Sequence, residues 1–257
     1  MKQLVLLLLI TFSLKTHSCQ IVEHNHFGRI LDFILPSDFH NNTLIVLAIA
    51  NTIAQPEKLI GSEEWVAYIM NTYGDTSISD IKARFQSIAP LYFEVMHTVN
   101  FIPIEPITAT IIRELQNSGV IVIGLTARSF EVAERTIEQL YNIGIDLSLA
   151  SLWHEELWHD CHLSYCHMNG VVFCDGNDKG KVLCQVLERI NYCPTKIIAV
   201  DDKERHLNAI AKAVCPCIEF VGIRYSYLDA KVKNFDTVAA DEQLLEWIMW
   251  QWLFEGY

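Results

Sequence analysis

The feature that most constrains this chain is a regular alternation of short, largely apolar runs with segments of helical spacing. Runs that are apolar at every position are typical of strands buried on both faces, and such strands occur in parallel sheets that helices cover on either side. We therefore predict an α/β fold with a Rossmann-like parallel sheet and helices on both faces. The predicted strands lie at 44–50, 120–124, 171–174, 196–200 and 218–223.

Helix boundaries follow from capping residues. Ser62, followed by two glutamates, predicts a helix that runs to about Tyr73. Ser129 and Asp178 are predicted to cap two further helices in the same way. A last helix is predicted over 242–254. Its apolar residues are expected to pack in the core; they are Leu245, Trp247, Ile248 and Trp252.

Two stretches do not follow the alternation. They cover about 53–103 and 147–170, and we expect small cap insertions there. The chain has 257 residues and is 51% hydrophobic, which is enough for one core, so we predict a single domain over 19–257. There are 19 basic and 31 acidic residues, and a net charge of −12 disfavours nucleic-acid binding because no basic stripe can neutralise phosphates.

The N-terminus is typical of an export signal. A lysine at position 2 precedes the apolar stretch Leu4 to Leu14, and small residues at 16 and 18 predict cleavage of residues 1–18. We therefore expect an exported protein, periplasmic or secreted, with acylation of Cys19 as a lipoprotein as the alternative. No later segment is long and apolar enough to cross a membrane.

The stretch 153–167 is rich in histidine and contains two of the eight cysteines. His162, Cys166 and His167 could bind zinc, which would suit a metal-sequestering protein, but their spacing matches no established zinc pattern. A disulfide between Cys161 and Cys166, or a polar loop, explains the stretch equally well.

Polar side chains follow four of the predicted strands. They lie in 51–52, 126–128, 177–181 and 201–202. Ligands of open parallel sheets bind beyond the carboxyl ends of the strands, so we expect these groups to meet at one edge. A hydroxyl, an ammonium and paired carboxylates suit a phosphate group and a divalent cation.

In this order, the four segments resemble the motifs of the haloacid dehalogenase (HAD) superfamily over about 44–225. The similarity is greatest to a group of exported bacterial HAD-like proteins, whose first strand ends in Asp-x-Asp-x-Thr and is followed by a Gly-Ser-x-x-Trp segment. The matching segments here are Ala48-Ile49-Ala50-Asn51-Thr52, Gly61-Ser62-Glu63-Glu64-Trp65, Gly124-Leu125-Thr126-Ala127-Arg128, Gly176-Asn177-Asp178-Lys179-Gly180 and Asp201-Asp202-Lys203.

The resemblance implies a magnesium-dependent phosphatase that works through an aspartyl-phosphate. It places the nucleophile at position 48 and the general acid and base at position 50. Thr52, Thr126, Arg128, Asn177 and Lys179 would bind the phosphoryl group, and Mg²⁺ would be held by Asp201, Asp202 and the Ala50 backbone carbonyl. The same residues also have ordinary structural explanations. Thr126 could be a turn hydroxyl, Arg128 and Asn177 could be exposed to solvent, and the tandem aspartates could cap a helix.

The chain departs from the family where chemistry would start, because positions 48 and 50 are both alanine. An alanine methyl group can neither attack phosphorus nor transfer a proton, and the loss of a carboxylate weakens Mg²⁺ binding. We therefore predict a catalytically dead phosphatase scaffold that still binds a small phosphorylated ligand. Deliberate substitution of both aspartates and a natural pseudophosphatase that binds a phosphorylated ligand or a partner both fit this pattern.

Overall fold

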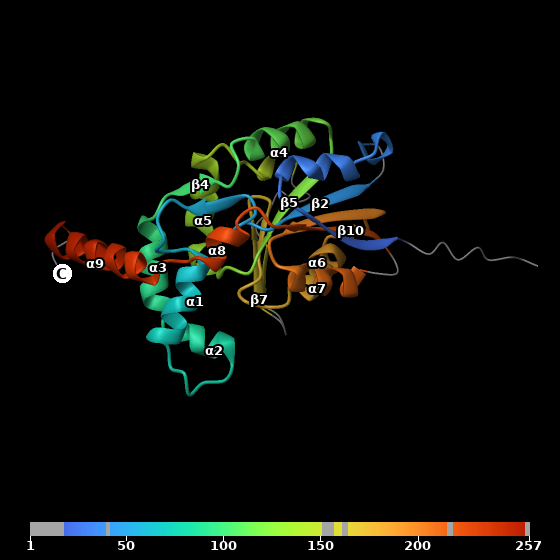
Figure 1. Ribbon diagram of the computed structural model, residues 1–257. Coiled ribbons are helices and arrows are strands. Elements are labelled where there is room, and N and C mark those ends of the chain that lie inside the picture. The colour runs from blue at the N-terminus through green and yellow to red at the C-terminus, as the bar shows by residue number, and fades with distance from the viewer. Residues whose placement is uncertain (1–17, 40–41, 151–156, 161–163, 215–217, 255–257) are drawn as a thin grey trace, which may run out of the picture.

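The computed structural model describes residues 18–39, 42–150, 157–160, 164–214 and 218–254. Its main sheet has the strand order β1-β10-β9-β2-β5-β8-β7-β6, in which the first six strands run parallel. The predicted α/β fold is confirmed, and Figure 1 shows helices on both sides of the sheet. The strands of this sheet are β1 (Cys19–His24), β2 (Thr43–Leu47), β5 (Ile121–Thr126), β6 (Leu157–Asp160), β7 (Ser164–Met168), β8 (Val171–Phe173), β9 (Lys196–Asp201) and β10 (Glu219–Tyr225).

Strand β2 explains why its sequence is apolar throughout. Successive side chains of a strand point to opposite faces, so a strand covered on both sides has no polar face. Ile45 and Leu47 pack in one core cluster with helix α4 (Thr108–Asn117). Leu44 and Val46 pack in a second cluster with α6 (Lys179–Arg189) and α7 (Glu204–Val214).

Two of the three predicted caps form as expected. The side chains of Ser62 and Asp178 accept backbone N–H groups at the start of α1 (Glu63–Thr72) and α6. The predicted cap at Ser129 is wrong: its hydroxyl donates to the Glu131 carboxylate. A 3₁₀ turn, η3 (Phe130–Val132), then precedes α5 (Ala133–Asn142), so the helix begins too late for Ser129 to reach its N–H groups.

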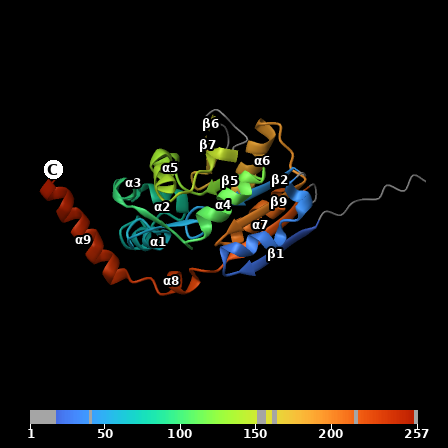
Figure 2. The ribbon, with the colours of Figure 1, turned by 90° about the horizontal axis from the view of Figure 1, so that it is seen from above.

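The first insertion forms a cap at the end of the sheet where the parallel strands terminate (Figures 1 and 2). It opens and closes with a two-stranded antiparallel sheet of β3 (Ala54–Pro56) and β4 (Phe101–Pro103). Between these strands lie α1, α2 (Ile81–Gln86) and α3 (Ala89–Thr98). Trp65 of α1 is completely buried and ties this cap to the main core.

The segment expected as a second cap insertion instead extends the main sheet. Strands β6 and β7 form an antiparallel hairpin, and β7 pairs antiparallel with β8. An antiparallel neighbour satisfies the backbone groups of β8 that would otherwise be an open edge. Three further segments are 3₁₀ helices: η1 (Phe27–Phe33), η2 (Pro36–Phe39) and η4 (Ser148–Ala150).

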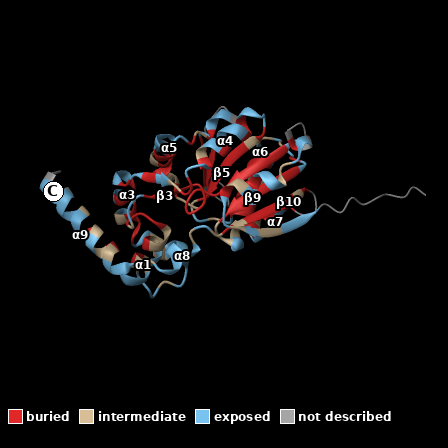
Figure 3. Ribbon diagram, turned by 45° about the horizontal axis from the view of Figure 1, so that its top comes forward, coloured by how far each residue is buried: buried red, intermediate tan, exposed pale blue. Residues whose placement is uncertain are grey.

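The C-terminal helix departs most from prediction. After the short α8 (Asp229–Lys233), α9 (Thr237–Phe254) begins five residues before the predicted start. Its first half packs against the cap, where the half-buried Trp247 contacts the core as predicted and donates to Thr98 Oγ1, and its C-terminal end extends away from the body (Figure 2). Leu245, Ile248 and Trp252 are 60%, 46% and 68% exposed, so predicting them as core residues was wrong. Figure 3 shows this end of the helix largely exposed. No helix within the described ranges has both the length and the hydrophobicity to span a bilayer.

Candidate functional site

The two alanines lie at the centre of the carboxyl edge of the sheet. Leu47, the last residue of β2, pairs with Gly124 on one side and with Val200 on the other. The Ala48 N–H donates to the Val200 carbonyl at 2.9 Å, which continues this register. Position 48 therefore lies between the ends of β5 and β9, which carry Thr126 and Asp201.

A buried ion pair crosses this edge. Lys179 Nζ donates to Asp201 Oδ2 at 2.6 Å, and both side chains are at most 5% exposed. Lys179 is the first residue of α6, where the helix dipole disfavours a cation. The contact with Asp201 offsets that cost, and the ammonium retains further N–H donors because it carries three.

Asp201 has two further donors. The Lys203 backbone N–H reaches Oδ1 at 2.8 Å, and His206 Nδ1 lies 3.1 and 3.2 Å from the two carboxylate oxygens. Burial alone would raise the pKa of Asp201, but the Lys179 ammonium, assisted by His206, holds that pKa well below its ordinary value. Asp201 is therefore an anion at neutral pH.

Sequence reasoning missed His206. It lies five residues after Asp201, in the first turn of α7, and a side chain there can fold back onto the strand end. Burial lowers the pKa of His206 more than its contact with Asp201 raises it. A neutral imidazole with its proton on Nδ1 fits this contact, because Asp201 can only accept.

Asp202 and Thr52 connect two of the motif loops. The Asp202 N–H donates to Thr52 Oγ1 at 3.2 Å, and Thr52 is completely buried. Burial, followed by the repulsion of Asp201, raises the pKa of Asp202 to about 7. The first and fourth motif loops are thus held together by a direct hydrogen bond.

The remaining predicted residues lie farther along the edge. Thr126 is 3% exposed, and its Oγ1 accepts the Arg128 N–H at 3.3 Å. The Arg128 guanidinium stacks over the Phe101 ring, 4.6 Å from its centroid, and donates to Thr136. Arg128 therefore joins the motif loop to the cap strand β4. Asn177, half-buried, lies in the turn before α6, where its N–H donates to the Cys174 carbonyl.

Three side-chain contacts join the cap to the motif loops. Asn51, with a positive φ of 56°, donates to Glu64 of α1 at 2.6 Å. Lys203 forms an ion pair with Glu63, and Lys82 of α2 pairs with Asp175 at 2.7 Å. These contacts reach the first, fourth and third motif loops, so the cap is fastened around the edge that carries the alanines.

The donor set does not fit a magnesium ion. Mg²⁺ prefers oxygen ligands in an octahedral arrangement, with carboxylates among them. Positions 48 and 50 offer no carboxylate, and Asp201 already accepts from an ammonium, a backbone N–H and an imidazole. In the described ranges, no three His, Cys, Asp or Glu side chains cluster as they would around a metal.

The described residues do not support the hypothesis that the stretch 153–167 binds zinc. Cys166 and His167 are adjacent on β7, so their side chains point to opposite faces, and both are buried. His162 of the proposed zinc site and Cys161 of the proposed disulfide lie outside the described residues. Residues 1–17 of the predicted export signal also lie outside them.

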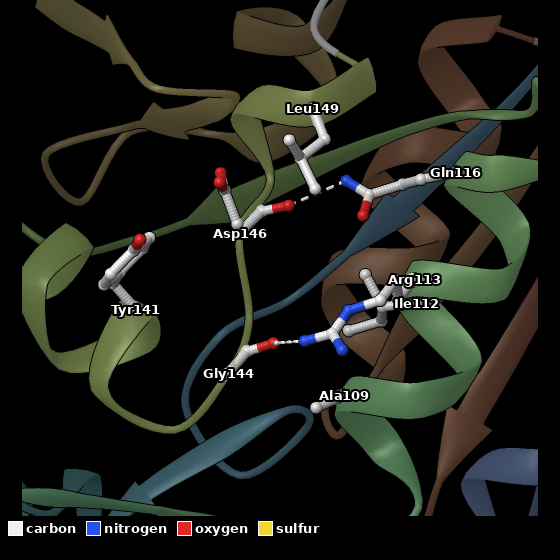
Figure 4. A pocket seen from close by; sticks show the side chains of 8 residues that line it. All are labelled: Ala109, Ile112, Arg113, Gln116, Tyr141, Gly144, Asp146 and Leu149. Carbon is white, nitrogen blue, oxygen red and sulfur yellow. Dashed lines mark hydrogen bonds between the residues drawn. The ribbon is translucent and has the colours of Figure 1, made fainter.

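A separate hollow of about 350 Å³ lies between α4 and the loop after α5 (Figure 4). Arg113 donates to the Gly144 carbonyl across it, and Gln116 donates to the Asp146 carbonyl. These bonds fasten two backbone segments together. None of the predicted site residues lines this hollow, whose lining comprises Ala109, Ile112, Arg113, Gln116, Tyr141, Gly144, Asp146 and Leu149.

Comparison with known proteins gives one family and a likeness to solved structures. A family described as "Protein of unknown function (DUF2608)" matches residues 23–253. A haloacid dehalogenase-like hydrolase from Streptococcus pneumoniae is 11% identical, with a TM-score of 0.41 over 74% of this chain and 97% of its own. A HAD-superfamily hydrolase of subfamily IA from Geobacter sulfurreducens is also 11% identical, with a TM-score of 0.39 over 74% and 98%. No curated protein matches the chain.

The sheet brings the four motif segments together, as the sequence predicted. Strands β2, β5 and β9, which precede the first, second and fourth motifs, are hydrogen-bonded neighbours, and β8 precedes the third. All four motif segments therefore meet at one carboxyl edge, with helices on both faces and a cap above. The chain therefore has the α/β fold and the shared carboxyl edge that the sequence predicted.

Proposed function

The chain belongs to the DUF2608 family of proteins of unknown function, and we propose that it binds a small phosphorylated ligand without hydrolysing it. The observation that carries this proposal is the juxtaposition of two alanines with a buried lysine. Ala48 follows β2 directly. The neighbouring strand β9 ends in Asp201, whose side chain is paired with Lys179 of α6.

Hydrogen-bond donors at this carboxyl edge would bind the ligand. One N–H of Lys179 is used by Asp201, and the others remain for phosphoryl oxygens. The hydroxyl of Thr126 also has a proton to donate, since its bond with Arg128 uses it as an acceptor. Hydrogen bonds from a charged donor to phosphate are among the stronger ones in proteins.

Hydrolysis fails for want of a nucleophile. The neighbouring thiol, Cys174, is buried, and burial raises its pKa to about 12, so it is not a thiolate at neutral pH. His206 directs Nδ1 to Asp201. Neither group replaces a carboxylate at position 48. A pseudophosphatase of this kind would be exported if the N-terminal signal acts as predicted.

The first experiment separates binding from turnover. The purified chain is mixed with Mg²⁺ and p-nitrophenyl phosphate, and no release of nitrophenol is expected. Titration calorimetry with inorganic phosphate is expected to show binding that Lys179→Met weakens by about ten- to hundredfold, as expected for one charged hydrogen bond. Turnover by the unaltered chain, or phosphate binding unaffected by Lys179→Met, would contradict the proposal.

A matched control is available elsewhere in the same sheet. Lys196 starts β9 and forms a second buried ion pair, with Asp38 at 2.8 Å. It lies about 17 Å along the strand from Asp201, at the opposite edge. Lys196→Met therefore removes a comparable buried cation and is expected to leave phosphate binding unchanged.

Restoring the missing carboxylates tests the rest of the machinery. The double variant Ala48→Asp, Ala50→Asp returns the nucleophile and the acid and base to the end of β2. We expect it to release phosphate from p-nitrophenyl phosphate in the presence of Mg²⁺. A silent double variant that still folds would mean that more of the site than the catalytic pair has been lost.

A further inference from the structure

We propose that the site binds its phosphorylated ligand without a divalent cation, and that the Lys179 ammonium supplies positive charge in its place. This inference rests on the proposed function and specifies the form in which the ligand is bound. It starts from the disagreement between the donor set and the magnesium site that the HAD resemblance implies.

Asp201, the predicted metal ligand at the end of β9, is already surrounded by hydrogen-bond donors. A carboxylate has about four lone-pair positions for donors. Lys179 Nζ lies 2.6 Å from Oδ2, the Lys203 N–H lies 2.8 Å from Oδ1, and His206 Nδ1 lies within 3.2 Å of both oxygens. A cation bound to this carboxylate would displace these donors and would lie against the ammonium of Lys179.

The two alanines also change the charge of the carboxyl edge. Two carboxylates at positions 48 and 50 would carry two negative charges, and a divalent cation would carry two positive ones. Replacing both aspartates by alanine removes the same charge that the cation would neutralise. What remains at the ends of β9 and α6 is the ion pair of Lys179 with Asp201 and, next to it, the Asp202 carboxyl. A phosphate dianion that approaches this edge therefore faces two negative charges fewer than it would beside the two aspartates, which lessens the need for a metal ion.

The contacts that hold the cap also affect the charge of this edge. The cations that fasten the cap, Lys203 and Lys82, are paired with Glu63 and Asp175. The amide of Asn51 reaches Glu64. The two ion pairs use the charges of Lys203 and Lys82, and the Asn51 amide carries no charge. The contacts that fasten the cap therefore leave Lys179 as the cation next to the alanines.

The experiment is a calorimetric titration of the full chain with inorganic phosphate, once in EDTA and once in excess Mg²⁺. Equal affinity in both, within about twofold, is expected. Mg²⁺ alone is expected to give no binding heat and no rise in melting temperature, because a ligand stabilises only a fold that it binds. Lys196→Met, the control for a lost buried cation, should bind phosphate in both buffers with the affinity of the unaltered chain.

The double variant Ala48→Asp, Ala50→Asp provides the opposite case. With two negative charges restored, its phosphate affinity in EDTA is expected to fall by tenfold or more, and Mg²⁺ is expected to restore it. Phosphate binding by the unaltered chain only in Mg²⁺ would overturn the metal-free inference and leave the proposed function standing. Failure to bind phosphate in either buffer would overturn both.

Discussion

The ion pair between Lys179 and Asp201 allows a stability prediction with a definite size. Lys179→Met keeps the length and the apolar part of the side chain and removes only the charge. Removal of one partner from a buried pair costs about 3–5 kcal/mol, because the other charge is left without compensation. Asp201 keeps its bonds from Lys203 and His206, which places the expected loss in the free energy of unfolding near the lower limit, about 3 kcal/mol.

Thermal unfolding followed by circular dichroism measures this loss. For a chain of this size, 1 kcal/mol corresponds to about 2–4 °C, so the melting temperature of Lys179→Met should fall by about 6–12 °C at pH 7. Lys196→Met breaks the pair with Asp38, whose side chains are both 7% exposed, and should lose a similar amount. The two variants then differ in phosphate binding and agree in stability.

The loss of stability in Lys179→Met should depend on pH, which provides a second test. In the unaltered chain the pKa of Asp201 is depressed, so this group contributes stability above its ordinary pKa and loses it as the pH falls through the folded-state value. Without Lys179, burial dominates and raises that pKa, so Asp201 takes up a proton more readily. The deficit of Lys179→Met should therefore be smaller at pH 4 than at pH 7. A melting temperature within about 2 °C of the unaltered chain at pH 7 would refute the reasoning.

Three further variants test other parts of the structure. Asp202→Asn removes a carboxyl whose pKa is raised to about 7, so ionisation costs stability as the pH rises toward 7; its gain in melting temperature should be larger at pH 8 than at pH 5. Ser62→Ala loses the cap bond to the Trp65 N–H, and urea denaturation should show a loss of about 1 kcal/mol that Ser62→Asp avoids. Gly180→Ala adds a methyl group 2.2 Å from the Ala209 carbonyl, and this clash should outweigh the roughly 1 kcal/mol of helix propensity; an unchanged melting temperature would contradict this.

Five strands of the main sheet and two helix starts were readable from the sequence because they depend on local rules. Apolar runs such as Leu44 to Leu47 specify a strand buried on both faces, and Ser62 and Asp178 specify where two helices begin. The motif residues were also visible, because strand ends in a parallel sheet share one edge. Ala48 and Ala50 are therefore informative in the sequence alone, as departures from a pattern that surrounds them.

Contacts between distant segments were decided only by the tertiary structure. Nothing in 147–170 specifies that β6 and β7 extend the main sheet, because strand pairing depends on which edge is open in space. The apolar residues of α9 are equally compatible with burial and with exposure, and only the position of the helix leaves Trp252 exposed. The contact of His206 with Asp201 depends on how α7 packs beneath β9. Periodicity specifies which face of an element is apolar, whereas the packing of the chain decides what lies against it.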